Sequence, residues 1–96
     1  MQPSVVTGLK AVEEKNEILV TWNRVPDVDL LGYNIFVNNY WVGTVDEKDT
    51  KFIIPKSKLE VPKGSKLTVS IEAFDYDGEV SKTRTKVVLW NYKWEF

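Results

Sequence analysis

The segment Leu67-Thr68-Val69-Ser70-Ile71-Glu72-Ala73-Phe74 alternates apolar and polar side chains over most of its length. Successive side chains of an extended strand point to opposite faces, so this alternation gives the strand one apolar face and one mainly polar face. The apolar face consists of Leu67, Val69, Ile71 and Ala73. Residues 67–74 therefore predict a half-buried β-strand rather than a helix.

The same period-two pattern recurs along the chain, and no segment sustains the apolar spacing of an amphipathic helix. Turn-forming residues separate the segments, and Asn38-Asn39 can adopt the positive φ angles of a tight hairpin. About seven short strands in this arrangement predict an all-β fold, a seven-strand antiparallel β-sandwich. The other inward-facing sets that the alternation predicts are Ile18, Val20 and Trp22; Tyr33, Ile35 and Val37; Phe52 and Ile54; and Thr83, Thr85, Val87 and Leu89.

The composition fits one small domain and removes several classes of function. The chain has 96 residues, of which 43% are hydrophobic and 12% aromatic, enough apolar material for a single core. It contains no histidine and no cysteine, which excludes cysteine nucleophiles, disulfides, imidazole or thiolate metal sites and Ser-His-Asp triads. Thirteen basic and fourteen acidic residues give a net charge of −1, which argues against nucleic acid or a membrane surface as partner. No apolar run is long enough for membrane insertion, and no cofactor is expected.

Several segments match, in order and spacing, the strands and loops of one known family. Trp22 closes an early strand, Gly32-Tyr33-Asn34-Ile35-Phe36 resembles a strand core of the form Gly-Tyr-x-Val-Tyr, and residues 69–81 carry the pattern Ala-x-Asp-x-x-Gly-x-x-Ser. Over residues 3–89 the chain resembles a fibronectin type III domain, one of the immunoglobulin-like β-sandwiches. The style is closer to bacterial and phage members than to those of the animal matrix.

One position departs from the family pattern. A tyrosine usually stands where this sequence has Leu67, and its hydroxyl ties the strand to the preceding turn. Leu67 can fill the space but cannot make that hydrogen bond. We therefore expect a looser turn at residues 59–64.

Acidic residues concentrate in three loops, residues 23–31, 46–49 and 75–79, which the resemblance places at one end of the sandwich. Calcium takes several oxygen ligands from adaptable loops, so these loops offer a weak calcium site, but turn capping by aspartate explains them without a metal and is favoured. The weak calcium candidates are Asp27, Asp29, Asp75, Asp77 and Glu79. The basic residues expected at the other end, giving a lengthwise charge polarity, are Lys56, Lys58, Lys63 and Lys66.

The C-terminal segment, residues 90–96, alternates aromatic and polar residues as an extension of the last strand of a sandwich over residues 1–89. Continued straight, the strand would expose its aromatic side chains to solvent, which predicts a protein partner or self-assembly through this strand. The alternative, held equally, is that a bulge or turn folds the tail over the domain's own apolar face. The aromatic residues are Trp90, Tyr92, Trp94 and Phe96.

Two phenylalanines, Phe36 and Phe74, also fall on the outward side of neighbouring strands. With Trp90 they could form a partner-binding patch, but a cross-strand aromatic pair that stabilises the sheet is the preferred interpretation. Sugar stacking is a third possibility, in which a polysaccharide partner would stack on Trp41, Trp90 or Trp94.

Together these observations favour a structural or interaction module that binds, spaces or assembles, and argue against an enzyme. The resemblance implies the same, because family members serve as spacers and adhesive modules. The main hypothesis is a module of an extracellular multidomain protein or of a phage virion, with the aromatic C-terminus slightly favouring the virion. The alternative is an accessory carbohydrate-binding or spacer module of a secreted polysaccharide-degrading enzyme. The expected location is extracellular or on a virion surface.

Overall fold

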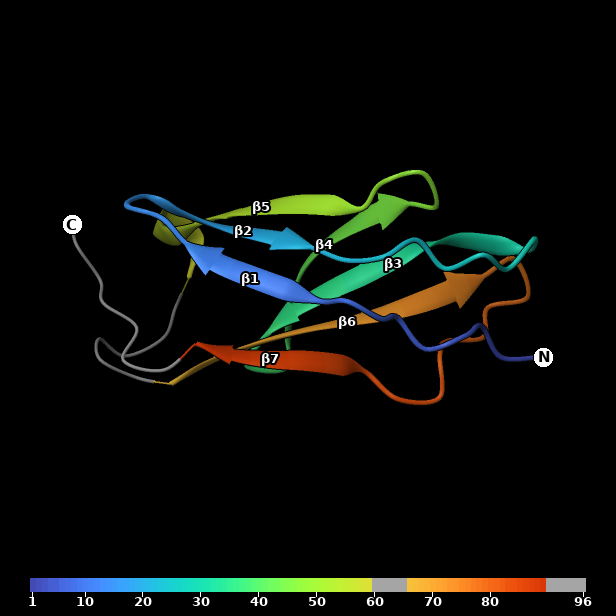
Figure 1. Cartoon of the computed structure of the whole chain (residues 1–96). Helices are drawn as coiled ribbons and strands as arrows, with labels where there is room; N and C mark the ends of the chain where they lie inside the picture. The colour runs from blue at the N-terminus through green and yellow to red at the C-terminus, as the bar shows by residue number, and fades with distance from the viewer. Residues whose placement is uncertain (60–65, 90–96) are drawn as a thin grey trace.

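The computed structural model describes residues 1–59 and 66–89 and shows two antiparallel sheets packed face to face (Figure 1). One sheet has three strands in the order β1-β2-β5, and the other has four strands in the order β4-β3-β6-β7. The predicted seven-strand sandwich is confirmed, and no helix within the described ranges is long and apolar enough to cross a membrane. The elements are β1 (Lys10–Glu13), β2 (Glu17–Thr21), β3 (Leu30–Val37), β4 (Tyr40–Asp46), β5 (Lys51–Pro55), the 3-10 turn η1 (Lys56–Lys58), β6 (Leu67–Asp75) and β7 (Thr85–Leu89).

The core lies between the two sheets and is built from alternating positions of the strands. The inward-facing sets predicted for β2, β3 and β6 are all buried, with Trp22 directly after β2. Ile54 of β5 is buried as predicted, while Phe52 is half-buried and packs against the core. The buried predicted residues are Ile18, Val20, Trp22, Tyr33, Ile35, Val37, Ile54, Leu67, Val69, Ile71 and Ala73.

The start of the last strand differs from the prediction. β7 begins at Thr85, and Thr83 is exposed in the bend before it, so its assignment to the inward set is wrong. The physical reason is the buried Ser81, whose hydroxyl accepts the Ala73 N–H at 3.1 Å and holds the chain in a bend before the ladder to β6 begins. Val87 and Leu89 follow the prediction in packing against the core, although both are only half-buried.

The predicted hairpin at Asn38-Asn39 is confirmed. Both residues have positive φ, 49° and 70°, and they connect β3 to β4 with Val37 opposite Tyr40. The turn is also tied to β6, because the Asn38 side-chain oxygen accepts the Thr68 N–H at 2.8 Å. The short, fixed turn sets the register of the two strands that carry the outward side chains discussed below.

The centre of the core is an aromatic contact between Trp22 and Tyr33, whose ring centroids lie 5.3 Å apart in a tilted arrangement. The Tyr33 hydroxyl accepts the N–H of Val25 at 2.9 Å and so ties β3 to the loop before it. Leu67 is fully buried, in agreement with its space-filling role. The looser turn expected at residues 59–64 lies mainly outside the described residues.

Candidate binding face

Outward side chains of the four-stranded sheet form two rows across the strands, because the register aligns them. The first row runs from Trp41 on β4 through β3 and β6 to Lys86 on β7. Three steps of about 4.8 Å between neighbouring strands make this surface about 14 Å wide. We call this surface the outer face, and its residues are Trp41, Phe36, Ser70 and Lys86 in the first row and Thr44, Asn34, Glu72 and Arg84 in the second.

A chain of hydrogen bonds crosses the outer face. The Trp41 indole N–H donates to the Thr44 hydroxyl at 2.9 Å, and this hydroxyl donates to the Asn34 side-chain oxygen at 2.6 Å. The Asn34 amide donates to one Glu72 carboxylate oxygen at 3.1 Å, and the Arg84 Nε donates to the other at 3.2 Å. All four bonds run towards the single carboxylate, so each polarises the next and the side chains are held in one arrangement.

The guanidinium of Arg84 lies over the Phe36 ring, with its central carbon 3.6 Å from the ring centroid. Phe36 is therefore only 7% exposed although it stands on the outer face. In the register Phe36 is opposite Ser70 and Phe74 is opposite Gly32, so the preferred interpretation of Phe36 and Phe74 as a cross-strand pair is wrong. Phe74 instead lies close to Gly32, whose missing side chain leaves room for the ring.

The contribution of this network to stability can be measured at Glu72. We expect Glu72→Ala to lower the free energy of unfolding by about 1–3 kcal/mol, because Asn34 and Arg84 lose a largely buried acceptor. Glu72→Gln keeps one acceptor oxygen and should cost less. Urea titration of the three proteins gives both differences. A loss below about 0.5 kcal/mol for Glu72→Ala would show that the bonds are worth no more than a surface ion pair.

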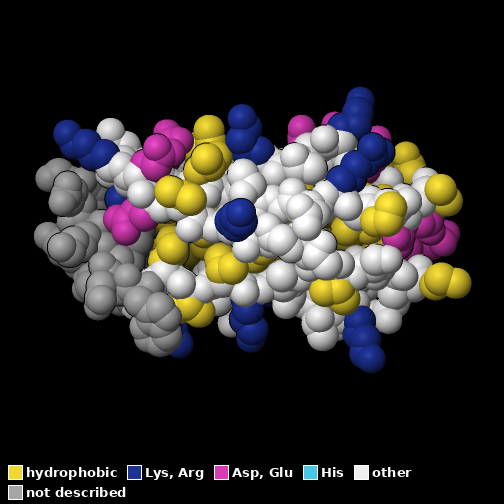
Figure 2. All heavy atoms as spheres, in the orientation of Figure 1, with side chains coloured by type: hydrophobic (Ala, Val, Ile, Leu, Met, Phe, Trp, Pro, Cys, Tyr) yellow, Lys and Arg dark blue, Asp and Glu magenta, His cyan; other side chains and the backbone are white. Residues whose placement is uncertain are grey.

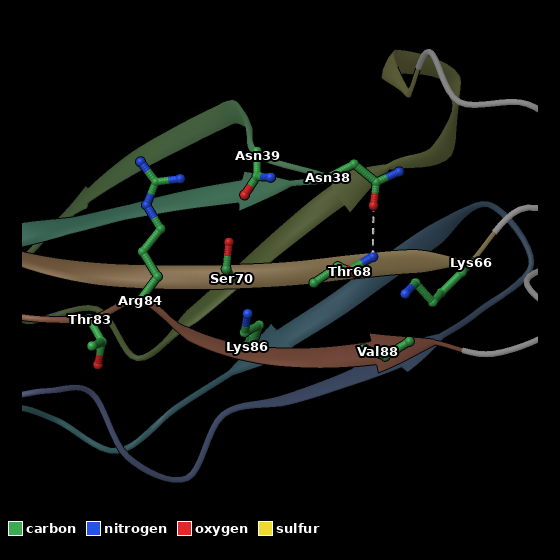
Figure 3. Close-up of a pocket in the computed structure, with 9 residues that line it drawn as sticks. All are labelled: Asn38, Asn39, Lys66, Thr68, Ser70, Thr83, Arg84, Lys86 and Val88. Atoms are coloured by element: carbon green, nitrogen blue, oxygen red, sulfur yellow. Dashed lines mark hydrogen bonds between the residues drawn. The ribbon is translucent and has the colours of Figure 1, made fainter.

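A groove borders this network on the β6-β7 side of the outer face (Figure 3). The hydroxyl of Ser70 is buried in it without a hydrogen-bond partner among the described residues. Its described lining residues include three cationic side chains and no acidic one. The lining residues are Asn38, Asn39, Lys66, Thr68, Ser70, Thr83, Arg84, Lys86 and Val88.

The predicted C-terminal interface falls outside the described residues. Trp90, Tyr92, Trp94 and Phe96 all belong to residues 90–96, so partner binding through them stays a prediction. Trp41, the remaining candidate for sugar stacking, is described and 62% exposed on β4.

Two of the three acidic loops, residues 23–31 and 75–79, meet at the end of the sandwich where the N-terminus lies (Figure 1). Carboxylate oxygens of Asp29, Asp75 and Asp77 come within 4.8 Å of one another. Asp27 lies apart from this cluster in its contacts, since its carboxylate accepts the N–H and the hydroxyl of Ser4 at 2.9 and 2.8 Å.

Asp75 acts as a turn cap. It is 2% exposed, and its Oδ1 accepts the N–H groups of Asp77 at 3.0 Å and Glu79 at 2.9 Å. Its Oδ2 is buried and has no hydrogen-bond partner within residues 1–59 and 66–89. Glu79 lies 3.3 Å from the amino group of Met1, whose pKa is raised by the hydrogen bond and the charge of that carboxylate. The structure thus brings three of the five calcium candidates together and gives a structural role to the central one.

The expected lengthwise charge polarity is weaker than the sequence suggested. Figure 2 shows acidic side chains at both ends of the molecule. The turn between β1 and β2 lies next to η1, and Glu13 forms an ion pair of 2.8 Å with the buried Lys56. The strand pairing places this acidic turn at the supposedly basic end, a neighbourhood that linear charge counting along the loops does not reveal.

Comparison with solved structures gives a match of substantial sequence identity. A region of the Clostridium perfringens spore cortex lytic enzyme SleM is 48% identical to this chain with a TM-score of 0.92, and the match covers 95% of the chain and 29% of SleM. A Fn3-like protein from Clostridium thermocellum is 22% identical, with a TM-score of 0.70 and complete coverage of both chains. A β-1,2-glucanase from Parabacteroides distasonis is 19% identical, with a TM-score of 0.63, over 98% of this chain and 13% of the enzyme.

The two weaker similarities show the fold alone, whereas the match to SleM extends to the sequence. No protein-family model matches the chain, and no curated protein matches it. These comparisons lend no support to a phage, virion or cell-adhesion context.

Proposed function

Because this chain is a fibronectin type III domain, we propose that it is a non-catalytic accessory module of a wall-lytic enzyme that acts outside the cytoplasm. The observation that carries the proposal is the 48% identity to SleM over 95% of the chain. At that identity the two sequences share far more than the apolar pattern a common fold requires. The proposal takes the alternative of the sequence analysis, an accessory module of a secreted polysaccharide-degrading enzyme, over the virion hypothesis.

Composition and fold agree with a non-catalytic role. Without histidine the chain lacks the commonest general base at neutral pH. In the part of the chain that the structure describes, side chains of the two sheets pack into one core between them, as expected of a module that works through its surfaces and loop ends. The chain spans 29% of SleM, which leaves the larger part of that enzyme for other functions.

The proposal can be tested by exchange. The region of SleM that matches this chain is replaced by the chain, and the chimaera is compared with intact SleM and with SleM lacking the region. On purified spore cortex we expect the lysis rate of the chimaera to be within about a factor of three of the rate of intact SleM. This corresponds to a difference of less than 1 kcal/mol in activation free energy. We expect the deleted enzyme to be clearly slower and the isolated chain to be inactive.

Two outcomes would contradict the proposal. Lysis by the isolated chain would show that it is itself catalytic. A chimaera no faster than the deleted enzyme would show that the chain does not serve as an accessory module of such an enzyme. The chimaera and the deleted enzyme should be compared at equal concentrations of folded protein, as judged by circular dichroism.

A further inference from the structure

Trp41 combines exposure with a fixed orientation. Its side chain is 62% exposed, yet its indole N–H is bound to Thr44 at 2.9 Å within the hydrogen-bonded chain of the outer face. An exposed aromatic ring that is already held in place loses little conformational entropy when a flat ligand stacks on it. The ring faces of sugars bind to such platforms when hydrogen-bonding groups stand beside them. Thr44 and Asn34 are polar neighbours of this kind.

The far side of the same face is cationic. Arg84 is fixed by Glu72 at 3.2 Å and by the Phe36 ring beneath it, while 39% of its side chain stays exposed. Nε is the donor used in the Glu72 bond, and a guanidinium has further N–H groups with the geometry to receive a carboxylate.

Lys86 adds a second positive charge beside Arg84. Its side chain is exposed and forms no ion pair or hydrogen bond with the described residues. In Figure 3 it stands on β7 next to Ser70 of β6. Among residues 1–59 and 66–89 no acidic side chain lines the groove, and Glu72, the carboxylate of the neighbouring row, is already bound by Asn34 and Arg84.

From this arrangement we propose that the outer face binds an acidic glycan, with one sugar stacked on Trp41 and a carboxylate of the glycan held by Arg84 and Lys86. The inference rests on the proposed function, since it names the surface and the ligand of the accessory module. The two contact regions lie at opposite ends of a row about 14 Å wide, which suits an extended chain of sugar rings rather than a monosaccharide.

Charge and polarity favour a glycan over a protein partner on this face. Phe36, the large apolar side chain at the centre of the first row, is only 7% exposed because Arg84 covers it. Between Trp41 and Lys86 the surface is therefore made of polar and charged groups instead of the apolar centre typical of protein interfaces. An exposed aromatic platform at one end of the row and cations at the other match a glycan that presents a flat sugar face and, farther along its chain, a carboxylate.

The test measures binding of the full chain to soluble peptidoglycan strands, which carry carboxylates, and to neutral N-acetylglucosamine oligomers of similar length. Isothermal titration calorimetry gives the dissociation constants. We expect the acidic strands to bind at least about tenfold more tightly than the neutral ones. We expect Trp41→Ala and Lys86→Glu each to weaken binding by about tenfold or more, and added salt to weaken the wild type more than Lys86→Glu.

Two control variants match these substitutions elsewhere on the surface. Tyr76→Ala removes an aromatic side chain that is 71% exposed at the acidic loop end, and Lys51→Glu reverses an exposed charge on β5 of the other sheet. Both should bind acidic strands as the wild type does. All four variants should keep the wild-type melting temperature within a few degrees, because the altered side chains are exposed.

Three outcomes would overturn the site. These are equal binding of neutral and acidic strands, equal loss in the test and control variants, and absence of glycan binding with a Trp41-dependent self-association in sedimentation velocity. The exchange experiment separates this failure from that of the proposed function. If the SleM chimaera is active and Trp41→Ala does not affect it, the accessory function is supported and the binding site is refuted. If the chain binds peptidoglycan strands but the chimaera is inactive, the binding site is supported and the accessory function is refuted.

Discussion

Trp22→Ala is expected to lower the free energy of unfolding by about 3–5 kcal/mol, the range for truncation of a large aromatic side chain in a packed core. Trp22 is 4% exposed and contacts the Tyr33 ring at the centre of the sandwich. The alanine would leave a cavity between the two sheets. Neither β2 nor β3 can move into this cavity without breaking backbone hydrogen bonds to its neighbouring strands. A domain of this size has roughly 5–14 kcal/mol of stability, so the variant should stay folded only marginally.

The measurement is urea denaturation followed by circular dichroism, with Trp22→Phe as the matched control. The indole N–H of Trp22 is buried without a hydrogen-bond partner among the described residues. Phenylalanine removes that group and keeps an aromatic ring against Tyr33, so we expect it to cost much less than alanine. Equal losses for the two variants would mean that ring packing at this position contributes little.

Gly32→Ala is the second substitution with a large expected effect. A Cβ atom at residue 32 would stand 2.2 Å from the carbonyl oxygen of Val45 and 3.1 Å from the Phe74 ring. The nearest obstacle is backbone of the neighbouring strand, which cannot move aside as a flexible side chain can. We expect a loss of about 3 kcal/mol or more, because β3 and β4 must separate locally.

Gly78→Ala provides the comparison, because it meets open space. Gly78 has a φ of 82° and no atom within 4 Å of the position that a Cβ would take. Its substitution therefore costs only the strain of the left-handed conformation, about 1 kcal/mol. Thermal unfolding of both variants gives the comparison. If Gly32→Ala were as mild as Gly78→Ala, the approach of β3 and β4 at Val45 would have to be looser than the structure shows.

The core could be predicted from the sequence because burial of one strand face is a local property. Period-two alternation assigned Leu67, Val69, Ile71 and Ala73 to the interior, and all are fully buried. Thr83 is an exception. The alternation in the sequence includes it, but in the structure it lies in a bend that depends on the hydrogen bond between Ser81 and Ala73. The two partners of this hydrogen bond are eight residues apart, and a pattern of alternating side chains does not reveal such a contact.

The outer face could not be predicted to the same depth, because it depends on the register between strands. Asn34 and Glu72 are 38 residues apart, and only the pairing of β3 with β6 brings them within hydrogen-bond distance. Phe36 and Phe74 show the same limit, as their alternation was right but their pairing depended on register. Trp41 was named as a stacking candidate, yet the polar groups beside it became visible only with β4 aligned to β3.

The number of strands has a mechanical consequence. Seven antiparallel passes are an odd number, so the segment before β1 and the end of β7 lie at opposite ends of the domain (Figure 1). A pull between those two points acts along the strands, while the hydrogen bonds from β1 to β2 and from β7 to β6 run across them. Both strand pairs are therefore loaded in shear, and their hydrogen bonds share the tension instead of breaking one after another. A chain built this way can transmit force along its axis, with the outer face turned sideways to the line of tension.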